Sequence, residues 1–213
     1  MKISKKIIAL IVALVSVLTL VACSSNSGKD STDNTQESEN SVIENNNSEN
    51  TKVKVTVKDY GEFIIELYPE YAPKTVENFI SLVKSGFYSG TVFHRVIDGF
   101  MAQGGAGVNG EKLEPIEGEF ASNGWTKNTL SHTRGVISMA RTSDPNSATS
   151  QFFICYDDTG CKGLDGDYAA FGKVIEGMEV VDKFLTAEKT YNSSLELAEP
   201  VEDIVIEKME IVK

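Results

Sequence analysis

The residues with the clearest chemical potential lie close together, because Arg95 is soon followed by Phe100, Met101 and Gln103. A guanidinium carries a permanent charge and five N–H donors, so it can stabilise a group that becomes a better acceptor during a reaction. An arginine taken at random pairs more often with a surface carboxylate, and apolar residues taken alone are more often core than ligand site. The adjacent His94 suggests acid–base chemistry, but we expect it to make a structural hydrogen bond instead.

A strand-like run further along the chain separates its aromatic residues onto two faces. Successive side chains of a strand point to opposite sides, so Phe152 and Ile154 share one face and Phe153 takes the other. All three cannot point into one core. Phe153 is therefore available for an outward-facing apolar pocket, and Cys155 lies on the same face as Phe153.

Other kinds of reactive site have little support in the sequence. Two histidines and three cysteines leave few ligands for a soft metal, so we expect no metal site and no cofactor. No Ser-His-Asp pattern is evident around the two histidines, which disfavours a hydrolase, and we expect His132 to make a structural hydrogen bond. Cys155 and Cys161 either form a disulfide or remain thiols, because spacing alone does not fix the distance between their Cα atoms.

The charge of the chain excludes one large class of partner. Acidic residues exceed basic ones by 31 to 20, which gives a formal net charge of −11. A chain this acidic is repelled by phosphate backbones, so nucleic acid is not an expected partner. Gly104–Gly110 is glycine-rich but lacks the Gly-Lys-Ser/Thr ending of a phosphate-binding loop, which also disfavours nucleotide binding.

Residues 1–22 have the pattern of an export signal. A lysine-rich start precedes the uncharged run Ile7–Val21, which is shorter than the roughly 18 apolar residues expected of a membrane-spanning helix. The run ends in Leu20-Val21-Ala22-Cys23, which resembles the lipobox of bacterial lipoproteins. That resemblance implies cleavage before Cys23 and lipidation of its thiol. We therefore expect an extracytoplasmic protein that is anchored to the bacterial cell membrane through Cys23.

Residues 23–51 are predicted to be a lipidated N-terminus followed by a disordered linker. Ser24–Thr51 is dominated by serine, asparagine and acidic residues, and Val42 and Ile43 are its only aliphatic residues. Such a segment cannot bury enough apolar surface to offset the entropy lost on ordering.

Residues 52–213 are predicted to form one β-rich domain. Valines 53, 55 and 57 alternate with polar residues, and after a turn Phe63, Ile65 and Leu67 alternate again, which indicates a hairpin. One helix is expected from Pro73 to a stop near Gly86, and a second over Met178–Leu185. Many short strands with two isolated helices are typical of a closed barrel. The other expected strands are 92–97, 100–103, 135–140, 151–155, 169–174 and Ile204–Val212.

Three segments of this domain resemble the signature blocks of a known family. They are Phe93-His94-Arg95-Val96-Ile97-Asp98-Gly99-Phe100-Met101-Ala102-Gln103-Gly104-Gly105, the stretch from Gly135 through Arg141 on to Ser150-Gln151-Phe152-Phe153-Ile154, and Leu164-Asp165-Gly166-Asp167-Tyr168-Ala169-Ala170-Phe171-Gly172-Lys173-Val174. In order and spacing they are similar to the cyclophilin family of peptidyl-prolyl cis–trans isomerases. The resemblance covers essentially all of 52–213.

The resemblance implies both a fold and an activity. The fold is mainly β, a cyclophilin-like closed eight-stranded antiparallel β-barrel capped by two α-helices. The activity is the acceleration of rotation about X-Pro peptide bonds, which together with the export signal suggests a role in the folding of exported proteins. The implied mechanism is stabilisation of the twisted amide by an arginine, which needs no metal and no cofactor.

The resemblance also implies roles for individual residues. Arg95 matches the family's catalytic arginine. Gln103 matches the glutamine that positions the peptide backbone, and Ala140 and Arg141 match the stretch whose main chain pairs with the substrate. Tyr168 occupies a position where many relatives have histidine and supplies an aromatic wall. The apolar pocket for the proline ring is matched by Phe100, Met101, Phe153 and Leu164.

The expected partners are proline-containing exported polypeptides and, through the N-terminal lipid, the membrane; we expect a monomer. The alternative is a proline-recognising binding module or chaperone with negligible turnover. Such a protein would keep the pocket and lose the arginine, whereas this sequence has both.

Overall fold

The computed structural model describes residues 50–213, apart from residues 109 and 111. The predicted signal segment, Cys23 and the linker as far as residue 49 lie outside the described residues. Within the described part of the chain, no helix has the length and apolar character needed to cross a membrane.

The domain opens with the predicted hairpin, formed by β1 (Lys52–Val57) and β2 (Gly61–Leu67). Side chains along both strands alternate between buried and more exposed, as the period of two in the sequence requires. Asp59 in the connecting turn has a φ of 63°, a left-handed conformation that aspartate tolerates better than most residues. The pattern-based prediction of this hairpin is confirmed.

Eight strands form one antiparallel sheet, in the spatial order β10-β1-β2-β7-β5-β6-β4-β3. The sheet curls on itself, and backbone hydrogen bonds from Phe93 to Ile204, from Gly90 to Ile206 and from Ile206 to Thr91 join its two edges. This confirms the predicted fold of eight antiparallel strands with two helices. The strands not yet named are β3 (Phe93–Val96), β4 (Met101–Gly104), β5 (Val136–Met139), β6 (Phe152–Cys155), β7 (Ala170–Glu176) and β10 (Ile206–Val212).

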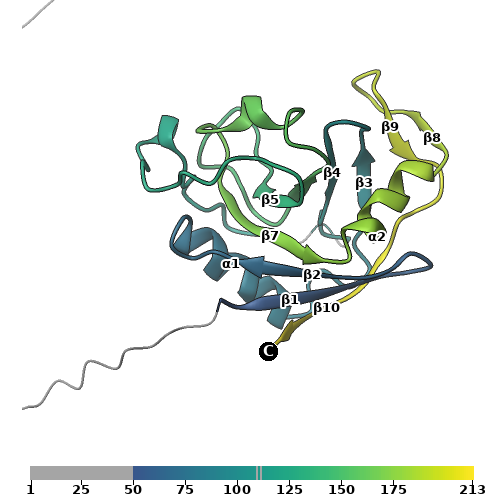
Figure 1. Cartoon of the computed structure of the whole chain (residues 1–213), viewed down its shortest axis with the longest axis horizontal. Helices are drawn as coiled ribbons and strands as arrows, with labels where there is room; N and C mark the ends of the chain where they lie inside the picture. The colour runs from purple at the N-terminus through teal and green to yellow at the C-terminus, as the bar shows by residue number, and fades with distance from the viewer. Residues whose placement is uncertain (1–49, 109, 111) are drawn as a thin grey trace, which may run out of the picture. The chain divides into compact units, whose positions relative to one another are not determined.

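The described residues contain two helices, α1 (Pro73–Lys84) and α2 (Met178–Lys183), which lie at opposite ends of the curled sheet (Figure 1). The start of α1 at Pro73 is as predicted. The second helix is shorter than the predicted Met178–Leu185, because the chain tightens into a 3₁₀ turn, η3 (Phe184–Thr186). Two further 3₁₀ turns are η1 (Ala121–Asn123) and η2 (Lys162–Leu164).

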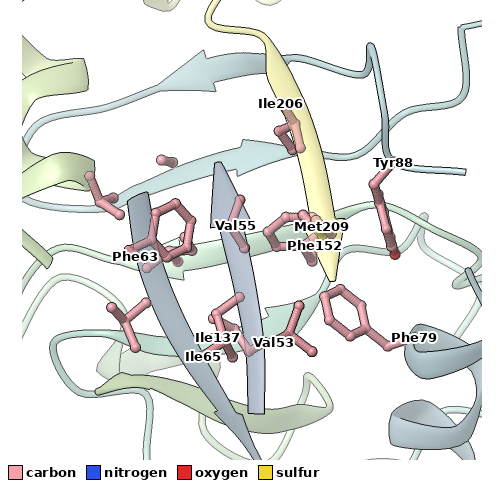
Figure 2. Packing of buried hydrophobic residues seen from close by; sticks show 14 of the residues in the cluster. Val53, Val55, Phe63, Ile65, Phe79, Tyr88, Ile137, Phe152, Ile206 and Met209 are labelled. Carbon is pink, nitrogen blue, oxygen red and sulfur yellow. The ribbon is translucent and has the colours of Figure 1, made fainter. Parts of the chain in front are cut away.

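The interior of the curled sheet is filled by apolar side chains from the strands and both helices (Figure 2). Phe79 of α1 packs its ring against Tyr88, Phe152 and Phe171, with ring centroids 5.1 to 5.6 Å apart. Phe152 is fully buried in this cluster. The barrel interior is therefore a packed core, and any ligand site must lie on its outer wall.

A second, two-stranded sheet was not predicted from the sequence. It is the hairpin of β8 (Lys189–Tyr191) and β9 (Leu197–Pro200), which lies beside β3 (Figure 1). The side chain of Asn192 closes its turn by accepting hydrogen bonds from the backbone N–H groups of Ser194 and Glu196. This hairpin places Glu196 next to the residues described below.

Candidate active site

The strand register places three of the predicted site residues in one row on the outer wall. Arg95 of β3 is paired with Gln103 of β4, and Gln103 is paired with Phe153 of β6. Residues paired across adjacent strands point their side chains to the same face of a sheet. The register of the sheet therefore assembles a cation, an amide and an aromatic ring side by side.

An apolar cluster separate from the main core forms the floor of this region. It consists of Met101, Phe153, Cys155 and Cys161, whereas Phe152 and Ile154 belong to the main core. The prediction that Phe153 points to the opposite face from its two neighbours is confirmed. The half-buried residues packed on this floor are Ile97, Phe100, Ala140, Leu164 and Tyr168.

The structure brings all nine residues predicted for catalysis and substrate binding together around one pocket with a cavity volume of about 140 Å³. A second pocket adjoins it and shares Gln103, Ala140 and Arg141, so the site continues as a groove along the surface. The residues lining the first pocket are Arg95, Phe100, Met101, Gln103, Ala140, Arg141, Phe153, Leu164 and Tyr168.

The guanidinium of Arg95 is held on two sides. Its Nε and Nη2 donate hydrogen bonds to the two carboxylate oxygens of Glu196, at 2.9 and 2.8 Å. Its Nη1 donates to Oε1 of Gln103 at 3.4 Å, and its Cζ lies 5.8 Å from the centre of the Phe100 ring. The side chain is 28% exposed, so the cation lies at the rim of the pocket and has access to a ligand.

The Gln103 amide has a defined orientation because both of its ends are bonded. Its oxygen accepts from Arg95, and its nitrogen donates to Oε1 of Gln151 at 3.0 Å. Gln151 also lines the adjoining pocket. Gln151 is not among the residues predicted for the site, although it is part of one of the quoted blocks.

The side chain of Arg141 is bound within the protein. Its guanidinium stacks over the ring of Tyr168 at 4.5 Å and donates two hydrogen bonds to the carbonyl oxygen of Asp167. These contacts hold the segment that carries Tyr168 against the pocket. The Arg141 side chain is thus occupied within the protein, and the backbone N–H of Ala140 donates to the carbonyl oxygen of Gln151 at 2.9 Å.

Comparison with known proteins identifies the family. Residues 52–211 match the family model described as "Cyclophilin type peptidyl-prolyl cis-trans isomerase/CLD". The chain belongs to this family. Its relatives include peptidyl-prolyl cis-trans isomerase B of Escherichia coli, which is 40% identical over 163 residues that cover 72% of this chain and 95% of the relative. A peptidyl-prolyl cis-trans isomerase of Acinetobacter baylyi is 50% identical over 63% of this chain and 71% of the relative.

Solved cyclophilin structures share the fold. A cyclophilin of Cryptosporidium parvum has a TM-score of 0.64 and 30% sequence identity, and the match covers 78% of this chain and 99% of that one. The same protein solved in the presence of the dipeptide Ala-Pro has a TM-score of 0.63 at 31% identity, over 76% of this chain and 99% of that one. Together with the curated relatives, these matches show that the chain is a peptidyl-prolyl cis–trans isomerase, which acts on proline-containing polypeptides.

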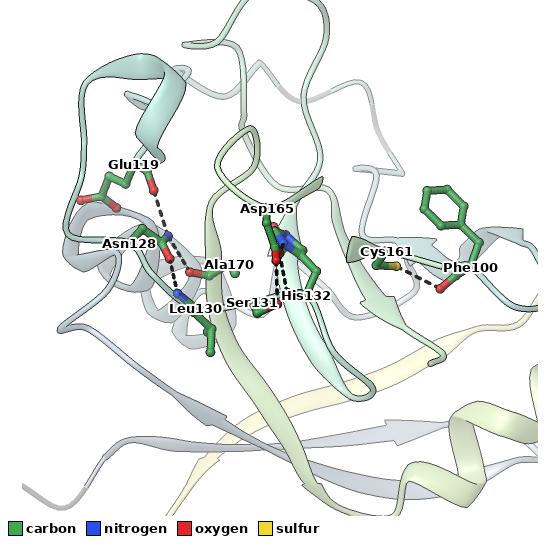
Figure 3. Close-up of polar contacts among 10 residues, drawn as sticks. Phe100, Glu119, Asn128, Leu130, Ser131, His132, Cys161, Asp165 and Ala170 are labelled. Carbon is green, nitrogen blue, oxygen red and sulfur yellow. Dashed lines mark hydrogen bonds and ion pairs between the residues drawn. The ribbon is translucent and has the colours of Figure 1, made fainter. Parts of the chain in front are cut away.

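Three residues of this cyclophilin, two of them buried, form an arrangement that we did not expect. Nδ1 of His132 lies 2.8 Å from Oδ1 of Asp165, and its Nε2 lies 3.0 Å from Oγ of Ser138 (the His132–Asp165 pair is drawn in Figure 3). The expectation that no Ser-His-Asp pattern accompanies the histidines is therefore wrong. The sequence could not show it because Asp165 is 33 residues from His132.

The Ser-His-Asp arrangement has a structural role. Ser138 and His132 are both fully buried, so a substrate carbonyl cannot reach the serine oxygen, and a hydrolase remains disfavoured. The His132 ring stacks on Phe153 with 5.9 Å between ring centres. Because an ionised carboxylate only accepts hydrogen bonds, Nδ1 donates to Asp165 and Nε2 accepts from Ser138. The predicted structural hydrogen bond of His132 is confirmed, and it supports the back of the pocket.

The pKa values of both histidines are lowered from 6.5, chiefly by burial. Burial lowers the pKa of His132, although the hydrogen bond to Asp165 opposes this effect. Burial also lowers the pKa of His94, a backbone hydrogen bond with Val92 raises it, and the neighbouring Arg95 lowers it. Nδ1 of His94 is buried and has no hydrogen-bond partner among the described residues, so the expected structural hydrogen bond is not made by this atom. Both side chains are neutral at pH 7.

The two cysteines behind the pocket are free thiols in this structure, and both are buried. The Cys161 thiol donates a hydrogen bond to the carbonyl oxygen of Phe100 at 3.1 Å (Figure 3). A hydrogen bond with Cys161, together with burial, raises the pKa of Cys155. The described residues contain no cluster of three or more histidine, cysteine or acidic side chains that could hold a metal ion.

Proposed function

We propose that Arg95 catalyses rotation about X-Pro bonds by stabilising the twisted amide, and that the substrates are exported polypeptides that fold near the membrane. Rotation breaks the amide resonance, against a barrier of about 18–20 kcal/mol. In the twisted state the prolyl nitrogen regains its lone pair and accepts a hydrogen bond. A catalyst must bind this state better than either planar form, and a fixed cation with directed donors does so.

The single observation that carries the proposal is the position of the guanidinium. Arg95 lies at the rim of a pocket floored by Met101 and Phe153, both of which are almost fully buried. Three of its five N–H groups are donated to Glu196 and Gln103, which leaves one on each terminal nitrogen for a substrate. A proline ring in the pocket would bring its amide within reach of these donors.

The pocket and groove explain how a substrate would be held. The ring of proline is apolar and fits a pocket lined by Phe100, Met101, Phe153 and Leu164, with Tyr168 as a wall. Gln103, Ala140 and Arg141 line the adjoining pocket, where an extended peptide would run. The solved relative that was studied with Ala-Pro supports a proline-containing ligand. A site that recognises one proline and the peptide backbone selects little of the surrounding sequence, so we propose that it accepts a broad range of substrates. We also propose that the protein is a monomer.

The catalytic role is tested with Arg95→Ala and Arg95→Lys in a protease-coupled assay on a proline tetrapeptide. Loss of a transition-state donor in a dry site costs on the order of 10²-fold in rate, so we expect Arg95→Ala to lower kcat/KM by about that factor. Arg95→Lys keeps the charge without the planar fork and should also be impaired. Unchanged circular dichroism shows that the fold is retained. Equal rates for Arg95→Ala and wild type would remove the catalytic role, and negligible turnover by the wild type would favour a binding module.

The location is a separate part of the proposal, and it rests on residues 1–22 and Cys23. In a bacterial host that expresses the full-length protein, we expect a labelled fatty acid to be incorporated into the wild type and not into Cys23→Ser. Cys155→Ser is the matched control, because it removes a different cysteine, and it should keep the label. A label that persists in Cys23→Ser would exclude the lipid anchor at this residue. One acyl chain holds a protein to a bilayer only weakly, so lasting attachment requires two or more.

A further inference from the structure

We infer that Glu196 is a positioning residue for isomerisation. Its carboxylate accepts hydrogen bonds from two nitrogens of Arg95 and thereby orients the rest of the guanidinium toward the pocket. The inference rests on the proposed function of Arg95 and concerns a residue outside the three sequence blocks. Glu196 lies 101 positions along the chain from Arg95, directly before β9 in the hairpin beside β3. It does not line the pocket itself.

The hairpin holds the Glu196 carboxylate in a fixed place. The backbone N–H of Glu196 donates to Oδ1 of Asn192 at 3.0 Å, and the backbone N–H of Asn192 donates to the carbonyl oxygen of Glu196 at 2.9 Å. Nδ2 of Asn192 donates in turn to Oε2 of Glu196 at 3.0 Å. The main chain and the side chain of Glu196 are thus both bound by Asn192. The position of the carboxylate is therefore defined independently of its contact with Arg95.

The contact with Arg95 has the geometry of a strong ion pair. Both carboxylate oxygens are used, each by a different nitrogen, at 2.9 and 2.8 Å. Such paired hydrogen bonds between planar groups define the orientation of the guanidinium as well as its position. Hydrogen bonds from Arg95 and from Asn192 lower the pKa of Glu196, so the carboxylate is ionised throughout the neutral range.

The contact with Glu196 leaves N–H donors on both terminal nitrogens of Arg95 for the reaction. It occupies Nε and one N–H of Nη2, while Nη1 faces Gln103 at the pocket rim. An unrestrained arginine side chain has many rotamers and would spend little time with a donor aimed at the prolyl nitrogen. The carboxylate also offsets part of the positive charge. The twisted amide is a neutral dipole, however, so a directed N–H stabilises it more than net charge does.

The inference is tested with Glu196→Ala and Glu196→Gln in the full-length protein, assayed for kcat and KM on a proline tetrapeptide. We expect Glu196→Ala to lower kcat/KM about tenfold, mainly through kcat, because loss of a charge-assisted positioning contact is felt in the transition state. Glu196→Gln keeps one acceptor oxygen for Arg95 and should recover part of the loss. Glu188→Ala is the matched control, because it removes an exposed carboxylate just before the same hairpin and should leave kcat/KM within about twofold.

A double-mutant cycle separates this inference from the proposed function. If Glu196 acts through Arg95, Glu196→Ala should have no further effect in an Arg95→Ala background. A normal rate for Arg95→Ala would remove the proposed function itself. A large loss for Arg95→Ala with an unchanged or faster rate for both Glu196 variants would overturn only this inference. If Glu196→Ala fails to fold by circular dichroism, the near-isosteric Glu196→Gln decides, and a wild-type rate for it overturns the inference.

Discussion

At the residue scale, the charge state of the site is simple. The arginine is always charged, and the apolar residues around it do not titrate. The histidines near the site are neutral at pH 7 because burial lowers the pKa of each one. The proposed mechanism therefore depends on the position of Arg95 and needs no proton transfer.

The first prediction at this scale concerns pH. We expect kcat/KM to be nearly flat from about pH 7 to pH 9, because the proposed mechanism transfers no proton. His94 and His132 have pKa values lowered from 6.5, and the pKa of Glu196 is lowered from 4.5, so all three keep their neutral-pH states across this range. The assay is the tetrapeptide rate at constant ionic strength. A bell-shaped profile within this range would point to a titrating catalytic group instead.

The second prediction concerns the apolar pocket. Leu164 is half-buried at the pocket wall, and we expect Leu164→Ala to lower kcat/KM about tenfold, equivalent to ~1.4 kcal/mol of lost apolar contact with the proline ring. The matched control is Leu185→Ala, the same truncation at a half-buried residue that packs against the main core. It should leave the rate within about twofold. Equal activity of Leu164→Ala and wild type would mean that the pocket does not receive the proline.

At the scale of elements, the start of α1 depends on a residue far away in the sequence. The helix has no side-chain cap of its own, and the buried Glu119 accepts hydrogen bonds from the backbone N–H groups of Lys74 and Thr75 and from the Thr75 hydroxyl, at 2.7 to 3.0 Å. Asn128 joins the carbonyl oxygen of Glu119 to that of Ala170 in β7 (Figure 3). Glu119 therefore ties the helix to a loop, and Asn128 ties that loop to the sheet.

The prediction at this scale is that Glu119→Ala lowers the free energy of unfolding by about 2–3 kcal/mol, because it leaves helical N–H groups and the Thr75 hydroxyl buried without partners. Urea unfolding followed by circular dichroism measures this change. Glu117→Ala removes an exposed carboxylate two residues away, whose partner is Lys74, and should change stability by less than about 0.5 kcal/mol. Similar losses for both variants would show that Glu119 does not cap the helix.

At the scale of the whole molecule, folding removes the groups that titrate near neutrality from full exposure to solvent. The chain has two histidines, and their exposure is reduced by the strands and loops of the curled sheet. A group whose pKa is lower in the folded state than in the unfolded state binds protons preferentially when unfolded. It thus contributes stability above its unfolded pKa and loses that contribution as pH falls.

The prediction that follows is a pH dependence of stability. We expect the free energy of unfolding to be constant from about pH 7 to pH 8 and to fall as pH drops below about 6.5, the ordinary pKa of histidine. Urea midpoints at pH 7.5 and pH 5.0 measure the fall, and at pH 5.0 the carboxylates with lowered pKa, such as Asp165 and Glu196, are still ionised. His132→Gln should reduce the difference between the two midpoints. A stability that rises on acidification would contradict the buried, neutral state of both histidines.

The sequence by itself determined the hairpin of β1 and β2, the start of α1, the outward direction of Phe153 and the nine residues of the pocket. Alternation and helix-start signals act between neighbours in the chain, so the first three features can be read locally. The nine pocket residues follow from the resemblance of the three blocks to the family.

Only the tertiary structure decided the β8–β9 hairpin, the grip of Glu196 on Arg95, the cap of α1 by Glu119 and the link from Asp165 through His132 to Ser138. The strands of that hairpin are three and four residues long and carry little pattern of their own. The side-chain links join Glu196 to Arg95, Glu119 to Thr75 and Asp165 to His132 across 101, 44 and 33 residues, a separation that no local pattern encodes. Such contacts form only when the sheet closes and brings distant segments together, because their residues have no interaction in the extended chain.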